Sequence, residues 1–287
     1  MPMFKKIREV GSGTFGKALL VADEHGKEFV MKVIDTAMMD IQARKTAQNE
    51  AQLLAGLGPH PFIIRYYRSY IQAKKLYIIM DFAEGGDMYQ KIRKQQSLAQ
   101  HFEEKTIRRW FTQAALGVHY LHRKHILHRD LKTQNIFLGK DGQLLLGDFG
   151  ISKVLENTLA CAQTTIGTPY YLSPELCRGE AYSYPADIWA LGCILYEMAS
   201  LKKPFEGSNI EELIRSIKSD KIPSLPRRYT SELSDLCLSL LHQNPSKRPS
   251  ISEILECDII KKEVEPIMAA HEKSKVYNTD IIGKTRS

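Results

Sequence analysis

A short polar segment between two apolar pairs carries several ionisable residues at close spacing. Residues 128–135 read HRDLKTQN, with Ile126-Leu127 before them and Ile136-Phe137 after them, and neither a helical nor a strand period runs through the segment. We therefore expect a loop that short buried strands hold at both ends. Because each unpaired buried charge costs several kcal/mol, the polar groups of such a loop must be satisfied by one another, by a metal or by a ligand. The segment is a candidate active site.

A second motif, residues 148–150 (DFG), follows after a short turn and completes a set of groups that suits phosphoryl transfer. That reaction needs oxygen ligands for magnesium, a cation, and a carboxylate near the attacking hydroxyl group. Asp148 and Asn135 are the expected metal ligands, and Lys132 is the expected cation. Asp130 would orient the hydroxyl group and accept its proton. The alternative is a surface loop of solvated charges, but the two motifs in this order and at this separation favour the chemistry.

Length and composition allow one large domain or two lobes, since the 287 residues are 43% apolar and 25% charged. The five cysteines form no Cys-x-x-Cys pair, so we expect reduced thiols in a cytosolic or nuclear compartment. No stretch of about twenty apolar residues occurs and the start lacks a signal-peptide pattern, so membrane insertion is not expected. The net charge of +7 comes without a dense basic block, so nucleic-acid binding is not expected either.

A glycine-rich segment, residues 11–16 (GSGTFG), lies between apolar runs at residues 4–10 and 18–22. In a dinucleotide-binding fold the last glycine opens a helix, but the second run is too short and too apolar for one. We expect a β-hairpin that covers phosphates instead. Its glycines would let the backbone approach the phosphate oxygens, and Phe15 would help to close the site.

Lys32 lies in an expected strand, residues 28–34, on the same face as its apolar neighbours. A lysine in that position either extends to water or has an anionic partner. We favour a partner, because Glu50 lies on the inward face of a helix expected between residues 40 and 57 and ended by Gly58-Pro59. Lys32 would bind the α- and β-phosphates and pair with Glu50.

Together these segments resemble the signatures of eukaryotic serine/threonine protein kinases, over about residues 4 to 262. Within those kinases the sequence is most similar to the NIMA-related family, in residues 16–21, 128–138, 146–151 and 167–175. The resemblance implies an α+β fold with two lobes: a five-stranded antiparallel sheet with one helix over residues 4–83, and a mainly helical lobe over residues 84–262. Residues 263–287 show no sustained heptads and are expected to be a tail or linker.

The resemblance also implies the cofactors, which are ATP with Mg²⁺, or with Mn²⁺ as a substitute. The backbone of Asp81 and Ala83 would bond the edge of the adenine. In this family the pair of Lys32 and Glu50 forms only when the helix swings inward, so it is the expected on/off element. The nucleotide-binding set is Val10, Gly11, Gly13, Phe15, Gly16, Ala18, Val30, Lys32, Met80, Asp81, Ala83, Asp87 and Phe137.

Residues 151–166 are polar and show neither period, so we expect them to be mobile until they are modified. By resemblance, Thr164 is the expected phosphorylation site, with Thr165 as the rival acceptor. Arg129, aided by Lys153, would bind the phosphate.

Residues 167–169 (GTP) resemble those of the serine/threonine subclass. In that subclass the threonine, here Thr168, bonds both the catalytic aspartate and the lysine, here Asp130 and Lys132. Tyrosine specificity is therefore not expected.

Four further features of the large lobe are expected, of which the resemblance implies the first two. Glu175 would form a buried ion pair with Arg248. Asp187 would open an apolar helix and bond the backbone of the segment 128–135. Three histidines invite a metal site by their spacing, but no inward carboxylate or cysteine accompanies them, so solvated or backbone-bonded side chains are favoured for His119, His122 and His125. Further helices are expected at residues 103–124, 209–219, 231–241 and 250–256.

Two functions are consistent with the sequence. The first is a serine/threonine protein kinase that an upstream kinase or the protein itself activates at Thr164. The second is a catalytically silent scaffold with the same fold; the presence of Lys32, Asp130 and Asp148 disfavours it. The expected partners are protein substrates, the chain is expected to be a monomer, and the family suggests roles in the cell cycle, at centrosomes or in cilia.

Overall fold

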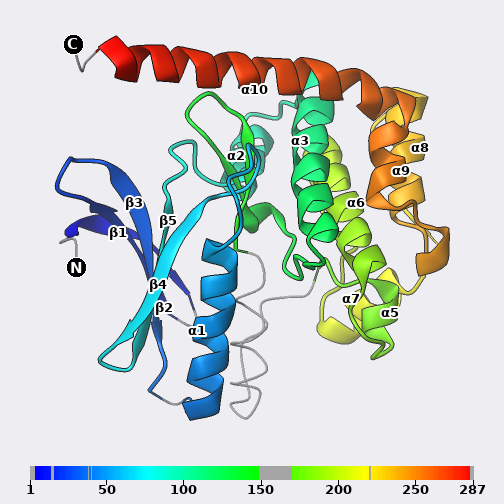
Figure 1. The fold of residues 1–287 in the computed structure, drawn as a ribbon. Helices are drawn as coiled ribbons and strands as arrows, with labels where there is room; N and C mark the ends of the chain where they lie inside the picture. The colour runs from blue at the N-terminus through cyan, green and yellow to red at the C-terminus, as the bar shows by residue number, and fades with distance from the viewer. Residues whose placement is uncertain are drawn as a thin grey trace.

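The computed structural model describes residues 4–13, 16–37, 39, 41–148, 170–219 and 221–284 of the chain. A small lobe built on a β-sheet lies beside a large lobe of helices (Figure 1). The helix α10 (Asp258–Lys284) runs along one edge of both lobes. This is the two-lobed α+β fold that the sequence predicts.

The small lobe is one antiparallel sheet with the strand order β1-β2-β3-β5-β4. Side chains alternate across it, so β5 sends Leu76 and Ile78 to the main core and Ile79 to the opposite face. The helix α1 (Ile41–Ala55) packs on the first face and contacts β4. The predicted hairpin and five strands are confirmed as β1 (Lys5–Gly13), β2 (Gly16–Ala22), β3 (Glu28–Asp35), β4 (Tyr66–Gln72) and β5 (Lys75–Asp81).

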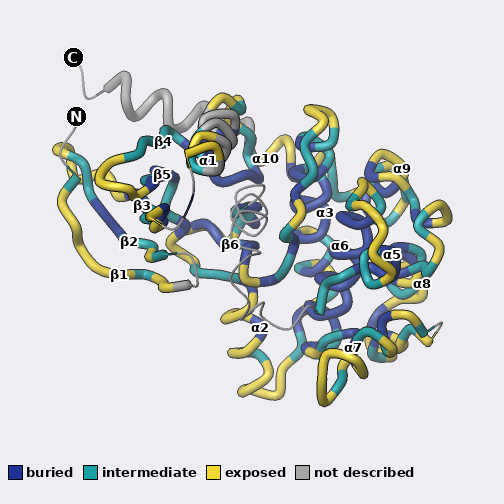
Figure 2. The backbone as a smooth tube through the Cα atoms, turned by 90° about the horizontal axis from the view of Figure 1, so that it is seen from below, coloured by how far each residue is buried: buried dark blue, intermediate teal, exposed yellow. Residues whose placement is uncertain are grey.

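The large lobe is centred on α6 (Tyr184–Ser200), whose side chains are buried from Ala186 to Ala199 (Figure 2). Two short strands, β6 (Ile136–Leu138) and β7 (Leu144–Leu146), pair with each other. The helices predicted at residues 103–124, 209–219, 231–241 and 250–256 are confirmed to within two residues at each end, whereas α6 begins three residues before the predicted Asp187. The other helices are α2 (Met88–Ser97), α3 (Glu104–Arg123), α5 (Pro174–Cys177), α7 (Ile210–Ile217), α8 (Ser231–Leu240) and α9 (Ile251–Glu256).

Polar side chains fix where several helices begin. The Asp87 carboxylate accepts a hydrogen bond from the Gln90 backbone at 2.8 Å and caps α2. Asp87 is the last residue of the link between the lobes, residues 82–87, which joins β5 to α2. Ser250 opens α9 with a capping box, because its hydroxyl accepts from the Glu253 backbone while the Glu253 carboxylate accepts from the Ser250 backbone. The sequence therefore sets these boundaries locally.

The segment before residues 128–135 is not a strand, and this expectation was wrong. α3 ends in a turn in which His125 adopts φ 57° and the Ile126 backbone donates to the carbonyl of Leu121 at 2.9 Å. A left-handed residue followed by such a bond terminates a helix and uses the backbone groups that a strand would need. On the other side, the predicted strand is present as β6.

The helix α10 crosses the predicted domain boundary at residue 262. Beyond that point, Glu263 forms an ion pair with Arg108 of α3 at 3.5 Å, and Ile267 is buried. Further on, His271 packs its ring against Phe62, which lies between α1 and β4. Residues 263–271 are therefore part of the packed domain, where the sequence suggested a tail or linker.

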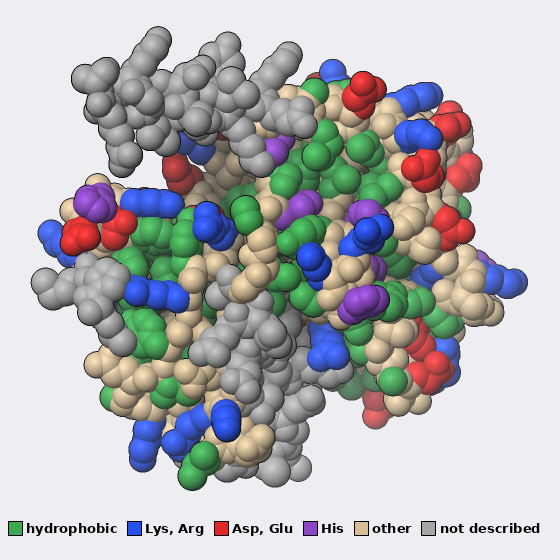
Figure 3. Space-filling view, in the orientation of Figure 1, with side chains coloured by type: hydrophobic (Ala, Val, Ile, Leu, Met, Phe, Trp, Pro, Cys, Tyr) green, Lys and Arg blue, Asp and Glu red, His purple; other side chains and the backbone are tan. Residues whose placement is uncertain are grey.

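Basic side chains are spread over both lobes on the face that Figure 3 shows. Within the described ranges, no helix combines the length and the apolar character that crossing a bilayer demands.

Candidate active site

The segment 128–135 brings its three predicted functional side chains together. Lys132 Nζ donates to both carboxylate oxygens of Asp130 at 2.8 Å. A 3₁₀ turn over Thr133–Asn135 then returns the chain, so that Asn135 Nδ2 donates to the Asp130 carboxylate at 2.7 Å and to its carbonyl at 2.8 Å. The carboxylate is thus oriented from two sides, as a group that positions a hydroxyl must be.

The fully buried carboxylate of Asp187 holds the segment 128–135 in place. It accepts hydrogen bonds from the backbone of His128 at 2.9 Å and of Arg129 at 3.1 Å, which confirms the predicted contact. Arg129 is held at φ 68°, a left-handed conformation that is strained for a residue with a side chain. The two backbone bonds fix this strained turn next to Asp130.

Two side chains that the sequence did not connect with the site also bond Asp187. His122 Nε2 contacts it at 2.8 Å and the Tyr182 hydroxyl donates to it at 2.6 Å. The expectation of a solvated or backbone-bonded His122 was therefore wrong. Burial alone raises the pKa of Asp187, but its hydrogen bonds, chiefly from His122, outweigh that effect and lower the pKa, so the carboxylate stays charged.

Lys32 of β3 forms its ion pair with Asp148, just after β7, and both side chains are partly buried. Asp148 adopts φ 56°, and its backbone donates to the hydroxyl of Tyr66 at 3.1 Å. The predicted partner, Glu50, has a side chain outside the described residues, so that pairing stays a prediction. Tyr66 is a further site residue; the sequence gave it no role because it reads as an ordinary buried strand residue.

Four predicted nucleotide-binding residues share one face of the sheet. Ala18 lies directly opposite Lys32 in the β2–β3 register, and Val30 lies opposite Met80 in the β3–β5 register. Opposed residues, and residues two apart in a strand, point to the same side. The sheet therefore places an apolar surface beside the Lys32 ammonium group, as an adenine ring next to phosphates would need.

The link between the lobes forms backbone hydrogen bonds with β6. Asp87 forms a bridge with Phe137, and the Gly85 backbone donates to the Leu138 carbonyl at 2.8 Å. Ala83 in this link is buried. Phe137, a predicted nucleotide-binding residue, is thereby held next to the link between the lobes.

Of the two glycines in the segment 11–16 whose surroundings are described, Gly16 alone is required by close packing. A Cβ atom on Gly16 would lie 1.9 Å from the carbonyl oxygen of Val33, whereas one on Gly11 would meet only Ala18 at 3.9 Å. Gly13 pairs with Gly16 across the hairpin and Val10 is half-buried beside it. The remaining predicted residues lie outside the described part of the chain: Phe15, Lys153, Thr164, Thr165 and Thr168.

The donor set fits a nucleoside triphosphate with a divalent cation. Asn135 bonds Asp130 through its amide nitrogen, and within the described residues its amide oxygen accepts no hydrogen bond. Asp148 likewise uses one carboxylate oxygen for Lys32. Magnesium-like cations bind few protein oxygens and take the others from phosphates and water, so one amide and one carboxylate oxygen suit them. Lys32 supplies the positive charge that phosphates need.

The predicted ion pair of Glu175 and Arg248 is confirmed and fully buried. Arg248 Nη1 and Nη2 each lie 2.7 Å from one oxygen of Glu175, and the guanidinium group also donates to the carbonyls of Pro185 and His242 at 2.8 Å. Burial raises the pKa of Glu175, but the hydrogen bonds and charge of Arg248 outweigh it and lower the pKa. The pair fastens the segment after residue 169 to the last helices.

This pair predicts how stability depends on pH. Because the pKa of Glu175 is lower in the folded state, its contribution is present above the ordinary value of 4.5 and is lost as the pH falls through the folded pKa. We expect the difference in unfolding free energy between the wild type and Glu175→Gln to be largest near neutral pH and to shrink below that value. Urea unfolding between about pH 3 and 7 measures it. A difference that grows on acidification would contradict the assignment.

Comparison with known families agrees with this geometry. The protein kinase domain family matches residues 4–260. The two lobes and the groups that meet between them therefore belong to that class of protein. Among curated proteins, mouse serine/threonine-protein kinase Nek1 is 42% identical over 270 residues, which are 94% of this chain and 22% of the relative. Mouse Nek4 is 42% identical over 280 residues, covering 96% and 35% respectively.

The probable serine/threonine-protein kinase nek3 of Dictyostelium discoideum is also 42% identical, over 267 residues that are 91% of this chain and 24% of the relative. The chain therefore belongs to the NIMA-related branch of the protein kinase family. It spans about a fifth to a third of the length of these relatives.

Proposed function

We propose that the chain is a serine/threonine protein kinase that uses ATP with Mg²⁺, or with Mn²⁺ as a substitute, and transfers the γ-phosphate to hydroxyl groups of proteins. One observation carries the proposal: Asp130 is held by Lys132 and Asn135, while Asp148 pairs with Lys32 across the two lobes. This supplies each group that phosphoryl transfer requires. The names of the relatives support serine and threonine as acceptors.

Each residue then has a distinct task. Asp130 orients the acceptor hydroxyl group and takes its proton, while Lys132 balances the charge that develops beside it. Lys32 binds the α- and β-phosphates, and Asn135 and Asp148 would hold the cation, which neutralises phosphate charge when it is bound. Because Lys32 already contacts Asp148, the phosphate-binding and metal-binding groups lie at one point.

We also propose activation by phosphorylation of Thr164, with Thr165 as the rival acceptor, by an upstream kinase or by the protein itself. Arg129 supports this proposal, because it is exposed and its guanidinium group makes no hydrogen bond or ion pair to a described residue. A phosphate placed nearby would find this cation available. The family suggests a role in the cell cycle, at centrosomes or in cilia, and we propose that the chain acts as a monomer in the cytoplasm or nucleus.

The test is label transfer from γ-labelled ATP to an array of serine, threonine and tyrosine peptides, with Mg²⁺ present or chelated. We expect label on serine and threonine peptides, none on tyrosine peptides, and none without the cation. A protein that binds ATP but labels no peptide and no protein would instead be the silent scaffold, which the complete set of catalytic residues disfavours.

A further inference from the structure

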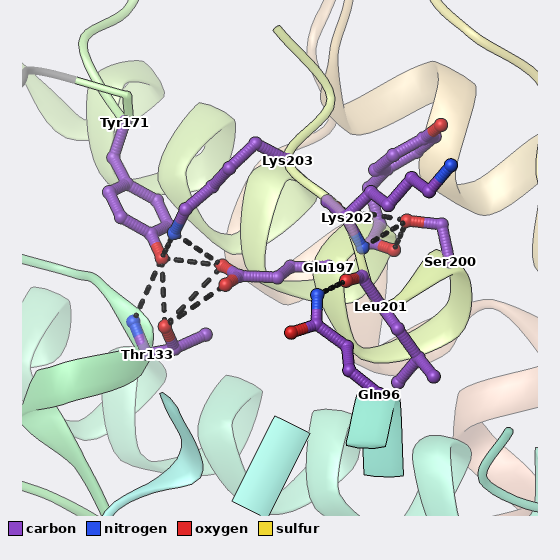
Figure 4. Close-up of polar contacts among 9 residues, drawn as sticks. Gln96, Thr133, Tyr171, Glu197, Ser200, Leu201, Lys202 and Lys203 are labelled. Carbon is purple, nitrogen blue, oxygen red and sulfur yellow. Dashed lines mark hydrogen bonds and ion pairs between the residues drawn. The ribbon is translucent and has the colours of Figure 1, made fainter. Parts of the chain in front are cut away.

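A polar cluster of two buried and two partly buried residues joins the segment 128–135 to the chain that follows residue 169. It consists of Thr133, Tyr171, Glu197 and Lys203, and these four residues define the Lys203 cluster (Figure 4). The Tyr171 hydroxyl donates to Glu197 at 2.5 Å and lies 2.9 Å from the hydroxyl of Thr133. Lys203 Nζ donates to Tyr171 at 2.5 Å and to Glu197 at 2.9 Å. Nothing in the sequence motifs connects these positions.

The end of α6 explains why Lys203 reaches back to Glu197. Leu201 follows the helix with φ 59°, and its backbone donates to the Glu197 carbonyl at 2.9 Å, so the chain reverses direction. The Leu201 carbonyl accepts from the side chain of Gln96, which holds the turn. Lys203 thereby returns over the helix end, and its ammonium group lies 4.2 Å from the centre of the Tyr171 ring.

Lys203 is the member of the cluster that balances the charge of Glu197. Glu197 is only 3% exposed, and Lys203 is the one cation that pairs with it among the described residues. A buried carboxylate without a cation costs several kcal/mol. Burial and the nearby Glu197 charge raise the pKa of Tyr171 well above its usual range, so its hydroxyl stays protonated and donates to the carboxylate. The cluster therefore carries no net charge.

The cluster also adjoins the turn that holds Asn135. Thr133 belongs to the same 3₁₀ turn as Asn135, whose amide bonds Asp130. Tyr171 belongs to the segment 170–175, which is fixed at its other end by Glu175 and Arg248. This segment is thus attached at two points, and the first of them, Thr133, lies in the turn whose Asn135 bonds Asp130.

We propose that Lys203 is a positioning and specificity residue for peptide substrates: it holds Tyr171 against Thr133 and neutralises Glu197, so that the site does not select a basic residue near the acceptor. The inference rests on the proposed kinase function. Without Lys203, Glu197 would need another cation, and an arginine of the substrate would supply it. Lys203 thus removes a preference for basic substrates, because it occupies the carboxylate that would otherwise bind them.

The test compares peptides that are identical except for arginine or glutamine at one position near the acceptor serine. For the wild type, we expect the ratio of kcat/KM values, arginine over glutamine, to stay near one at every position. For Lys203→Met, we expect the ratio to rise about tenfold or more at one position, through KM, because a hydrogen bond between charged groups is worth that much. Lys203→Arg should keep the wild-type ratio, because it retains a cation beside Glu197.

Lys202→Met is the matched control, because it removes the same charge from an exposed neighbour outside the cluster. An unchanged ratio in Lys203→Met, or the same change in Lys202→Met, overturns the inference. Peptide affinity measured by fluorescence anisotropy keeps the test separate from turnover: a wild type that transfers no phosphate defeats the proposed function, while the affinity ratios still decide the role of Lys203. If Lys203→Met does not fold, adding Glu197→Gln should restore folding, and a double variant that stays unfolded also overturns the inference.

Discussion

Replacing Asp148 by asparagine is expected to reduce phosphate transfer by about a thousandfold or more, since the charge stabilisation it supports is worth several kcal/mol and each 1.4 kcal/mol is tenfold. The substitution removes the anionic oxygen that would hold the cation, and it removes the carboxylate that pairs with Lys32. Asparagine has nearly the same shape, and the backbone bond from residue 148 to the hydroxyl of Tyr66 is kept. The fold should therefore persist.

Steady-state kinetics with a serine peptide measure the loss, and Asp141→Asn, in an exposed turn, is the matched control. A second readout is independent of turnover. For the wild type, ATP with Mg²⁺ should raise the Tm more than ATP with a chelator does, because a ligand that binds the folded state stabilises it. Asp148→Asn should lose that difference. A variant with undiminished turnover would refute the metal-binding role.

Replacing Arg248 by methionine is expected to lower the unfolding free energy by about 3–5 kcal/mol. The reason is that Glu175 would remain buried with no cation, and the carbonyls of Pro185 and His242 would also lose their donor. Burying a charge without a partner is among the few changes that cost this much. Because Glu175 belongs to the segment 170–175, peptide phosphorylation should fall as well.

Urea unfolding followed by tryptophan fluorescence gives the unfolding free energy. Trp189 is a suitable reporter, because the Arg248 guanidinium carbon lies 4.9 Å from the centre of its ring. Arg227→Met, on the exposed surface, should change stability little. The double variant Arg248→Met with Glu175→Leu should recover most of the loss, because an apolar pair of similar volume no longer buries a charge. If Arg248→Met is as stable as Arg227→Met, the ion pair of Glu175 and Arg248 does not stabilise the fold.

The sequence by itself determined the local chemistry of the site. Asp130, Lys132 and Asn135 lie within one short loop, so their convergence needs only the 3₁₀ turn that follows Lys132. The hairpin around residues 11–16 and the strand that carries Lys32 also follow from short patterns of glycine and alternating apolar residues. The family resemblance added the long-range pairs of Glu175 and of Asp187, which no periodicity could supply.

Only the tertiary structure decided which distant groups meet. The sequence favoured Glu50 as the partner of Lys32, and the structure shows an ion pair between Lys32 and Asp148. Tyr66, His122 and Lys203 read as ordinary strand, helix and loop residues, because their partners lie far away in the sequence or beyond a reversal of the chain. Periodicity reports which face of an element is buried, whereas the partner of a polar side chain depends on where the elements come to rest in three dimensions.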